Sequence, residues 1–189
     1  MNVQIILAGI GGQGILFSSK VFSELGLKMG LEIMGSETHG MSQRGGSVIA
    51  HLKLGKFQSP LIRKGAADIL YSFEENETYR TLHFLKSGGI CFVNLESADQ
   101  FNKSIMKFLK EKEITFRAYD ATGAASKIGS IRSANIALIG YSVGTGLVPF
   151  AYKDLRYVLE TVSRKKDLKI NLKALDAGFQ EGKLLGSNP

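Results

Sequence analysis

Short apolar runs alternate with longer amphipathic stretches along the whole chain. The first run, residues 3–8, is short and rich in β-branched side chains, which predicts a strand buried on both faces. From Ile15 onward the apolar residues recur at roughly helical spacing, which predicts a helix ending near Gly26 or Gly30. The same reasoning predicts strands at residues 31–34, 67–73, 90–94 and 114–119, and helices at residues 74–86, 99–112, 153–164 and 168–180.

Residues 47–54 alternate between apolar and more polar positions. Val48, Ala50, Leu52 and Leu54 fall on one face, whereas Ile49, His51 and Lys53 fall on the other, so we expect a strand with one wetter face. Pro60 excludes a central strand just beyond it. Strands that alternate with helices predict a three-layer α/β/α Rossmann-like domain, residues 1–189, whose mostly parallel sheet carries a hairpin insertion after the second strand.

Glycines and caps suggest where several helices begin and end. Gly88 and Gly89 are expected to break the helix over 74–86, Asp167 to cap the last helix, and Gly182 to follow its end. Phe101, Ile105, Phe108 and Leu109 are the inward positions of the helix over 99–112. Residues 133–141 are apolar on most sides, and their small side chains permit close helix packing, although a buried strand remains open.

The first strand and the first helix are joined by a turn made of Gly11, Gly12, Gln13 and Gly14. Glycine reaches positive φ without a steric penalty, so the backbone can turn sharply there. A helix N-terminus after such a turn leaves unpaired N–H groups that suit a phosphate, a carboxylate or another polar backbone. The turn is therefore expected to contact an anionic group or a polar backbone of a partner chain.

Gly9-x-Gly11-x-x-Gly14 also matches the dinucleotide-binding fingerprint. That fingerprint requires an acidic residue about 20 positions later, at the end of the second strand, to bind the ribose. Glu32 precedes an apolar pair and Glu37 lies beyond a Gly-Ser step, so neither sits convincingly at that strand end. A free-standing NAD-binding enzyme therefore stays as an alternative to a turn that serves packing, anion binding or partner contact.

Residues 35–46 form the most unusual stretch of the chain, because they are polar and rich in glycine and have almost nothing to bury. Glu37, His39, Gln43, Arg44 and Gly45 lie within it. Ordering such a loop is costly, so it is either mobile or bound by a ligand or partner. Glu37, His39 and Arg44 do not make a metal site, since the ligand spacing and a third neutral donor are missing.

Composition restricts the function classes further. The chain has 189 residues, 44% of them hydrophobic and 22% charged, and no apolar stretch approaches the length of a membrane span. No basic leader precedes the first apolar run, so we expect a cytoplasmic protein. The net charge of +7 is dispersed over several helices, which favours solvated surfaces over nucleic-acid binding. A basic surface also suits an acidic partner or a phosphorylated cofactor.

Cys91 is the only cysteine in the chain. Disulfides within the chain are therefore impossible, and the chain by itself cannot ligate an iron–sulfur cluster or a cysteine-rich zinc site. Cys91 lies in a buried-strand pattern, so we interpret it as a small core residue rather than a nucleophile. No metal is expected.

The motifs together resemble one family. The Gly-Ile-Gly-Gly-Gln-Gly-Ile run at residues 9–15, followed by the stretch at 35–47 with its Ser-Gln-Arg-Gly-Gly motif, is similar to the gamma-type subunits of 2-oxoacid:ferredoxin oxidoreductases, in particular to the small (beta) subunit of the indolepyruvate branch. Residues 59–62 and 65–68 also resemble that family. So do the later positions Asn135, Asn171, Ala174, Phe179 and Gly182.

The resemblance implies a subunit that supports the coenzyme A-dependent oxidative decarboxylation of a 2-oxoacid. Thiamine diphosphate and iron–sulfur clusters would reside on a large partner subunit, with ferredoxin as electron acceptor, and this chain would bind no cofactor and be inactive alone. Indolepyruvate or a related aryl-pyruvate is the expected substrate. Pyruvate, 2-oxoisovalerate and 2-oxoglutarate remain alternatives.

If residues of this chain reach the chemistry, the polar stretch is the best candidate. The planar guanidinium of Arg44 can pair with a carboxylate or phosphate through two N–H groups, and a histidine such as His39 titrates near neutrality and can donate a proton. By the same resemblance, contacts with substrate, coenzyme A or the partner would come from Gly11, Gly12, Gln13, Gly14, Glu37, Gln43 and Gly45. The alternative is that the stretch folds against the large subunit and its polar groups serve only that interface.

Overall fold

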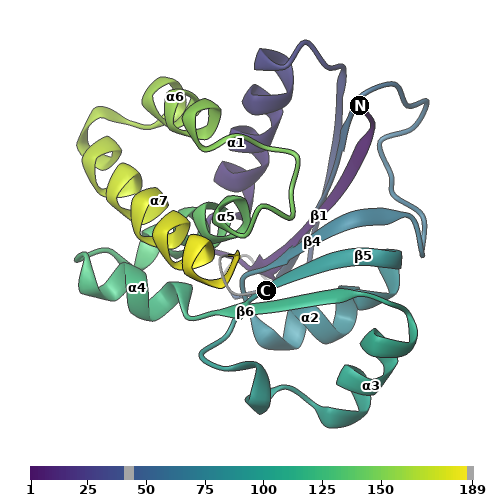
Figure 1. Ribbon diagram of the computed structural model, residues 1–189. Coiled ribbons are helices and arrows are strands. Elements are labelled where there is room, and N and C mark those ends of the chain that lie inside the picture. The colour runs from purple at the N-terminus through teal and green to yellow at the C-terminus, as the bar shows by residue number, and fades with distance from the viewer. Residues whose placement is uncertain (41–44, 187–189) are drawn as a thin grey trace.

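The computed structural model describes residues 1–40 and 45–186. They contain one six-stranded sheet with the order β2-β3-β1-β4-β5-β6 (Figure 1). The strands are β1 (Val3–Ile10), β2 (Ile33–His39), β3 (Ser47–Leu54), β4 (Ala67–Ser72), β5 (Leu85–Asn94) and β6 (Thr115–Tyr119). The α-helices are α1 (Ile15–Lys28), α2 (Glu75–Thr81), α3 (Lys103–Glu111), α4 (Ala121–Lys127), α5 (Ala134–Gly144), α6 (Tyr152–Val162) and α7 (Lys165–Gly186), and the short 3-10 helices are η1 (Leu82–Phe84), η2 (Ala98–Gln100) and η3 (Ile131–Ser133).

The sheet is mostly parallel, as the sequence predicts. β1, β4, β5 and β6 run in parallel register, whereas β3 pairs antiparallel with both β1 and β2. The β2–β3 hairpin is therefore inserted beside β1, with β3 as the direct neighbour and β2 at the edge. The predicted three-layer α/β/α class with a hairpin insertion is confirmed.

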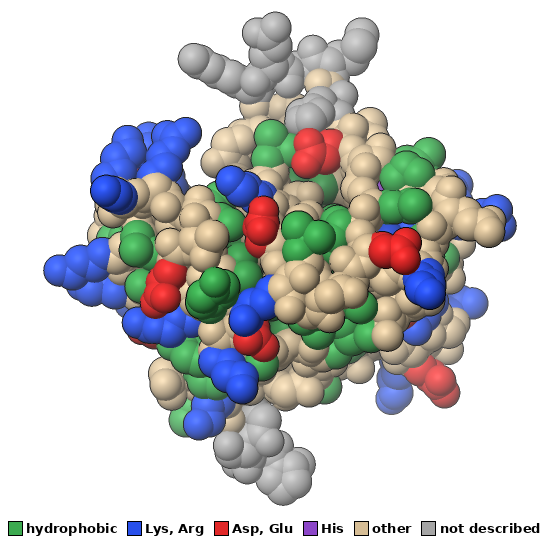
Figure 2. Space-filling view, turned by 90° about the horizontal axis from the view of Figure 1, so that it is seen from above, with side chains coloured by type: hydrophobic (Ala, Val, Ile, Leu, Met, Phe, Trp, Pro, Cys, Tyr) green, Lys and Arg blue, Asp and Glu red, His purple; other side chains and the backbone are tan. Residues whose placement is uncertain are grey.

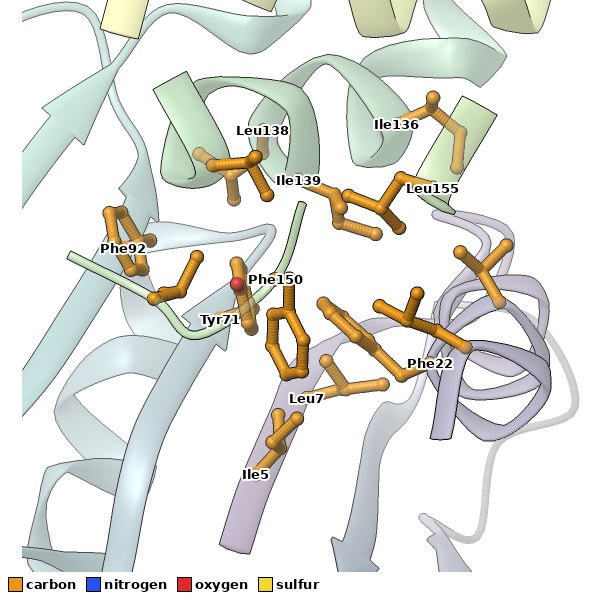
Figure 3. Close-up of a cluster of buried hydrophobic side chains, with 14 of the residues drawn as sticks. Ile5, Leu7, Phe22, Tyr71, Phe92, Ile136, Leu138, Ile139, Phe150 and Leu155 are labelled. Carbon is orange, nitrogen blue, oxygen red and sulfur yellow. The ribbon is translucent and has the colours of Figure 1, made fainter. Parts of the chain in front are cut away.

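Two apolar layers cover the two faces of the sheet. On one face, α1, α5 and α6 bury a cluster around Phe22, Tyr71 and Phe150 (Figure 3). The Phe22 ring lies 5.1 Å from the Tyr71 ring and 5.4 Å from the Phe150 ring. The Tyr71 hydroxyl shares a 2.8 Å hydrogen bond with Ser142 of α5, so this polar atom is satisfied within the apolar layer. On the other face, α2 and α3 cover a second cluster that includes Ile6, Cys91 and Leu109.

The longest helix, α7, packs against the outer side of α5, so α5 is enclosed between the sheet and α7 (Figure 1). Four glycines form this contact: Gly140 and Gly144 on α5, and Gly178 and Gly182 on α7. A Cβ atom at Gly140 would lie 2.4 Å from the carbonyl oxygen of Leu175, and one at Gly178 would lie 1.9 Å from that of Ala137. The two backbones are in direct contact, which only glycine allows.

Several predicted helix ends and helix faces are wrong. Gly182 does not follow the last helix, because α7 continues to Gly186 and uses Gly182 against α5. Asp167 is not a cap but lies inside the first turn of α7. Gly88 and Gly89 lie within β5, where a register irregularity beside β4 accommodates them. The predicted helix over 74–86 is consequently shorter, and Phe108 of α3 is 40% exposed rather than inward.

The prediction that one face of β3 is exposed to solvent is also wrong. His51 and Lys53 are both buried, because the irregular segment that follows β3 covers them. The Ile62 N–H donates to Nδ1 of His51 at 3.2 Å, and Lys53 lies over the Phe57 ring. Burial, with the Lys53 charge as a smaller cause, lowers the pKa of His51, which keeps the imidazole neutral and able to accept this bond.

The glycine contact between α5 and α7 generates a stability prediction. Replacing Gly178 by Ala adds a methyl group against the Ala137 carbonyl, so the helices must separate. Overpacking of this kind outweighs the better helix propensity of alanine, and we expect a loss of about 2 kcal/mol in the free energy of unfolding by urea denaturation. Lys173→Ala, at an exposed position of α7, is the control. Equal stability of Gly178→Ala and the parent would show that the two helices do not touch.

Candidate functional site

The glycine turn lies at the carboxyl edge of the parallel strands, between β1 and α1. Gly12 and Gly14 have φ values of 103° and 78°, in the region that favours glycine. Gly14 is also the N-cap of α1 and provides no side chain to cap it. The first N–H groups of α1 are therefore available to a group outside the helix.

The side chain of Gln13 folds back onto the strand. Its Oε1 accepts a 2.9 Å hydrogen bond from the N–H of Ile10, which closes the turn. A Cβ at Gly9 would lie 2.6 Å from this same oxygen, so a small residue is needed beneath it. The expected contact of Gln13 with a substrate, coenzyme A or partner stays a prediction, and its Oε1 already stabilises the turn.

Asn135, at the start of α5, braces the turn from the other side. It is 3% exposed, and its Nδ2 donates to the carbonyl oxygen of Gly14 at 3.1 Å and to Ser18 Oγ at 3.0 Å. Ser18 Oγ in turn donates to the same Gly14 carbonyl at 3.0 Å. A Cβ at Gly14 would lie 2.6 Å from Asn135 Nδ2, so glycine is required by both its φ and this contact. The conformation of the turn thus depends on a residue more than a hundred positions away in sequence.

The β2–β3 hairpin brings the two glycine-rich motifs together. The N–H of Gly11 donates to the carbonyl of Gly46 at 2.9 Å, and the N–H of Gly40 donates to the carbonyl of Ser47 at 2.7 Å. Ser47 Oγ donates to the buried carboxylate of Glu77 at the start of α2. Gly45 and Gly46 consequently lie beside the turn.

The remaining predicted residues of the polar stretch are placed only in part. Glu37 lies on β2 with its side chain exposed, and it is separated from β1 by β3. His39 ends β2, and only its backbone is described. Gln43 and Arg44 lie outside the described residues. The catalytic roles expected for His39 and Arg44 therefore stay predictions.

A cavity of about 460 Å³ opens beside the turn, between the start of α1 and the start of α7. We call it the basic cavity; its lining includes Gly12, Lys20, Arg132, Asn135, Arg164 and Lys166. Four of these side chains are cationic, and Asp167 is the only acid among all the lining residues. Lysine and arginine side chains also gather on the flank formed by α6 and α7, at the left of Figure 2. The geometry suits an anion that also approaches the N–H groups of α1.

The sequence did not identify the basic cavity. Residues 164–173 are interpreted there as a solvated helix face, and Arg132 falls in a small-residue segment. The cations come from three separate segments, so no local run of the sequence contains the site. Only the family resemblance indicates Asn135.

The topology argues against a dinucleotide site of the usual kind. In that fold the second strand is the direct neighbour of the first, which brings its terminal acid to the ribose. Here β3 separates β2 from β1, so Glu37 cannot occupy the position of the ribose-binding acid. The N–H of Gly11 is also already bonded to the carbonyl of Gly46.

Metal and thiol chemistry find little support in the described part of the chain. Residues 1–40 and 45–186 contain no group of three His, Cys, Asp or Glu side chains placed to hold a metal ion. Cys91 is fully buried, and burial raises the pKa of its thiol, so it stays protonated. The prediction that Cys91 is a core residue is confirmed.

None of the helices within residues 1–40 and 45–186 has both the length and the apolar character needed to cross a bilayer.

Comparisons with known proteins give a consistent picture. Residues 4–181 match the family described as pyruvate ferredoxin/flavodoxin oxidoreductase. The chain is 30% identical over 192 residues to the indolepyruvate oxidoreductase subunit IorB of Archaeoglobus fulgidus, with 96% of each chain covered.

Two solved structures share the fold. The gamma subunit of a keto/oxoacid ferredoxin oxidoreductase from Geobacter sulfurreducens superposes with a TM-score of 0.75 at 20% identity, covering 96% of this chain and 99% of that one. The 2-oxoglutarate:ferredoxin oxidoreductase of Magnetococcus marinus, with 2-oxoglutarate, coenzyme A and succinyl-CoA bound, has a TM-score of 0.78 at 20% identity, covering 97% of this chain and 31% of that one.

The brace at Gly14 generates a prediction about the turn. Asn135→Ala removes both hydrogen bonds of Nδ2 and leaves a small void, so we expect a loss of about 1–3 kcal/mol in unfolding free energy. Amide hydrogen exchange should accelerate most at residues 11–18. Asn76→Ala, at an exposed asparagine of α2, is the matched control. Unchanged exchange in the turn of Asn135→Ala would show that the turn holds its shape without the brace.

Proposed function

The chain belongs to the pyruvate ferredoxin/flavodoxin oxidoreductase family, as a small subunit of the 2-oxoacid:ferredoxin oxidoreductase type, and from this premise we propose that it serves the oxidation of indolepyruvate or a related aryl-pyruvate. In the proposed reaction the 2-oxoacid loses its carboxylate as CO₂, the acyl group replaces the thiol proton of coenzyme A, that proton is released, and two electrons pass to ferredoxin. The observation that carries the aryl-pyruvate assignment is the near-complete coverage by the relative named for indolepyruvate.

The cysteine content of this chain determines which subunit we assign the cofactors to. One cysteine does not fit an iron–sulfur cluster, which needs several cysteine thiolates that converge on the cluster. We therefore assign the clusters and the thiamine diphosphate to a large partner subunit, where the bound cofactors carry the decarboxylation and the electron transfer. Residues 1–189 act in this proposal as one gamma-type domain in a cytoplasmic complex.

The contribution proposed for this chain is to present the glycine turn and its surroundings to the partner. Leu16 and Ile131 flank the turn and are 50% and 62% exposed, although both are large apolar side chains. Apolar exposure around a rigid polar turn is typical of an interface. Within this interface Glu37, His39, Gln43 and Arg44 are proposed to meet either the substrate or the partner.

The basic cavity is proposed to receive the phosphates of coenzyme A. Arg132, Arg164, Lys166 and Lys20 provide positive charge, and the N-terminus of α1 adds its unpaired N–H groups. The residues present thus fit a multiply charged, phosphorylated substrate. A bound coenzyme A in the Magnetococcus marinus enzyme, which shares the fold, is in keeping with this proposal.

Two alternatives differ in their support. The equivalent subunit for pyruvate, 2-oxoisovalerate or 2-oxoglutarate remains a second candidate, because the family as a whole acts on several 2-oxoacids. A free-standing NAD-binding enzyme has less support, because the inserted strand β3 removes the ribose-binding position.

Reconstitution tests the proposed function. The chain is purified alone, its large partner is purified alone, and the two are co-expressed; each sample is assayed with indolepyruvate, coenzyme A and a viologen dye. We expect dye reduction only from the complex, and higher kcat/KM for indolepyruvate than for pyruvate or 2-oxoglutarate. Full activity of the large subunit alone would contradict a required role, and a preference for another 2-oxoacid would contradict the substrate assignment.

The basic cavity gives a sharper kinetic prediction. In the reconstituted complex, the double variant Arg164→Ala/Lys166→Ala should raise the KM for coenzyme A about tenfold, equivalent to about 1.4 kcal/mol, with kcat nearly unchanged. Lys103→Ala/Lys107→Ala removes two charges from the exposed side of α3 and is the matched control. The same KM in both double variants would place the phosphates of coenzyme A elsewhere.

A further inference from the structure

A second hollow lies at the far end of the carboxyl edge, away from the glycine turn. It measures about 560 Å³ and is bounded by the end of β6, by α4 and by the last turns of α7. Figure 1 shows β6 leading directly into α4, with the C-terminal part of α7 beside them. We call it the acidic hollow. It is lined by Glu96, Tyr119, Asp120, Lys127, Tyr141 and Glu181, with apolar walls between them.

The floor of the hollow is a pair of stacked tyrosines. The rings of Tyr119 and Tyr141 have centroids 4.7 Å apart and planes inclined by only 11°. Tyr141 belongs to α5 and also packs edge-on against Phe92 of the core. The apolar walls come from small and aliphatic side chains such as Ala124, Ile128 and Leu185. An aromatic floor of this kind attracts an apolar body or a cation placed above it.

The side chain of Tyr141 is buried, but its hydroxyl is open to the hollow. The residue is only 1% exposed, and its hydroxyl makes no hydrogen bond with any residue of the described chain. Fully enclosed side-chain polar atoms within residues 1–40 and 45–186 all have partners, so this hydroxyl must keep its remaining contact with the hollow. Buried polar groups in folded proteins are satisfied as a rule. The open side of this hydroxyl is therefore the hollow, where a ligand atom can hydrogen-bond to it.

The charges around the hollow favour a cation. Glu96, Asp120 and Glu181 face it with three carboxylates, against one ammonium group from Lys127. One carboxylate oxygen of Asp120 already has a partner, because Oδ1 accepts a hydrogen bond from the N–H of Gly123 at the start of α4. Neither Glu96 nor Glu181 has an ion pair or a hydrogen bond within the described residues. The guanidinium of Arg117, which also acts on Tyr141, donates to the Phe116 carbonyl at 3.0 Å.

The tyrosines themselves stay neutral in this setting. Burial, together with the charges of Glu181 and Asp120, raises the pKa of Tyr119 to about 12. Burial is also the main cause that raises the pKa of Tyr141. Both phenols therefore keep their protons at physiological pH, and each has lone pairs to accept a hydrogen bond from a donor.

We propose that the acidic hollow is a binding site for a small organic cation, with an ammonium group carried on an aromatic or apolar body. The ammonium would donate to the Tyr141 hydroxyl and to the Glu181 carboxylate, and the body would lie on the tyrosine floor against the apolar walls. The site is separate from the basic cavity, which lies at the start of α7 rather than near its end. It does not depend on the proposed enzymatic function.

Calorimetric titration of the full chain with 2-phenylethylammonium tests this site directly. We expect saturable binding of one equivalent, and no measurable binding of 2-phenylethanol or phenylacetate, which have the same ring but no positive charge. Tyr141→Phe removes only the hydroxyl, and Glu181→Gln only the charge. Each should weaken binding about tenfold, the size expected for one hydrogen bond to a charged group.

Matched controls keep the test decisive. Tyr157→Phe and Glu111→Gln alter an exposed tyrosine and an exposed glutamate outside the hollow, and should bind as tightly as the parent. Glu181 is exposed, so Glu181→Gln should fold normally even if Tyr141→Phe does not. Absence of saturable binding would overturn the proposal. So would equal binding of the neutral or anionic probe, or equal binding by the parent and Glu181→Gln.

The ammonium group could come from a free amine or from a lysine side chain of a partner subunit. Repeating the titration on the assembled complex separates the two sources. Retained binding of the probe indicates a free amine, whereas binding by the free chain that disappears on assembly indicates that a partner side chain fills the hollow. Either result supports recognition of a cation at this site.

Discussion

The direct backbone contact between α5 and α7 is the constraint on which the rest of this structure depends. Gly140 and Gly144 meet Gly178 and Gly182 with no room for a side chain on either helix. Because the two axes are so close, α5 is fixed between the sheet and α7 over its full length. Contacts of this kind allow little adjustment, since any added atom must move a whole helix.

A hollow lined by charged residues lies at each end of this helix pair. At the start of α5, Asn135 reaches the glycine turn and fixes the conformation that leaves the N–H groups of α1 available. The start of α7 adds Lys166 to the same place, which completes the basic cavity. At the other end, Tyr141 of α5 and Glu181 of α7 meet over the end of β6 and form the acidic hollow. One packing arrangement thus positions two sites of opposite charge.

The sequence predicts local features well and long-range ones poorly. β1, the glycine turn and the start of α1 follow from a run of about 20 residues, because apolar periodicity and glycine chemistry are local. The strand at residues 47–54 follows from its alternation. The extension of β2 through the polar residues 35–39 does not follow, because only pairing with β3 makes a strand of them. The burial of His51 and Lys53 does not, since it depends on the loop that folds over β3. The sequence predicts a helix stop at Gly182, because a glycine used for close helix contact has the same local sequence as one that ends a helix.

In the candidate site, too, the local features follow from the sequence and the long-range ones do not. The Gly-Gly-Gln-Gly and Ser-Gln-Arg-Gly-Gly motifs are visible in the sequence, but that Gly11 and Gly46 meet is seen only in the structure. The basic cavity is assembled from residues 12–20, 130–135 and 162–171, and no single segment indicates it.

The most direct test of whether the glycine turn faces the partner compares amide hydrogen exchange of the free chain with that of the assembled complex. We predict that protection on assembly is concentrated at residues 9–17 and 131–135; protection confined to α3 and its side of the sheet would contradict the claim that the glycine turn faces the partner.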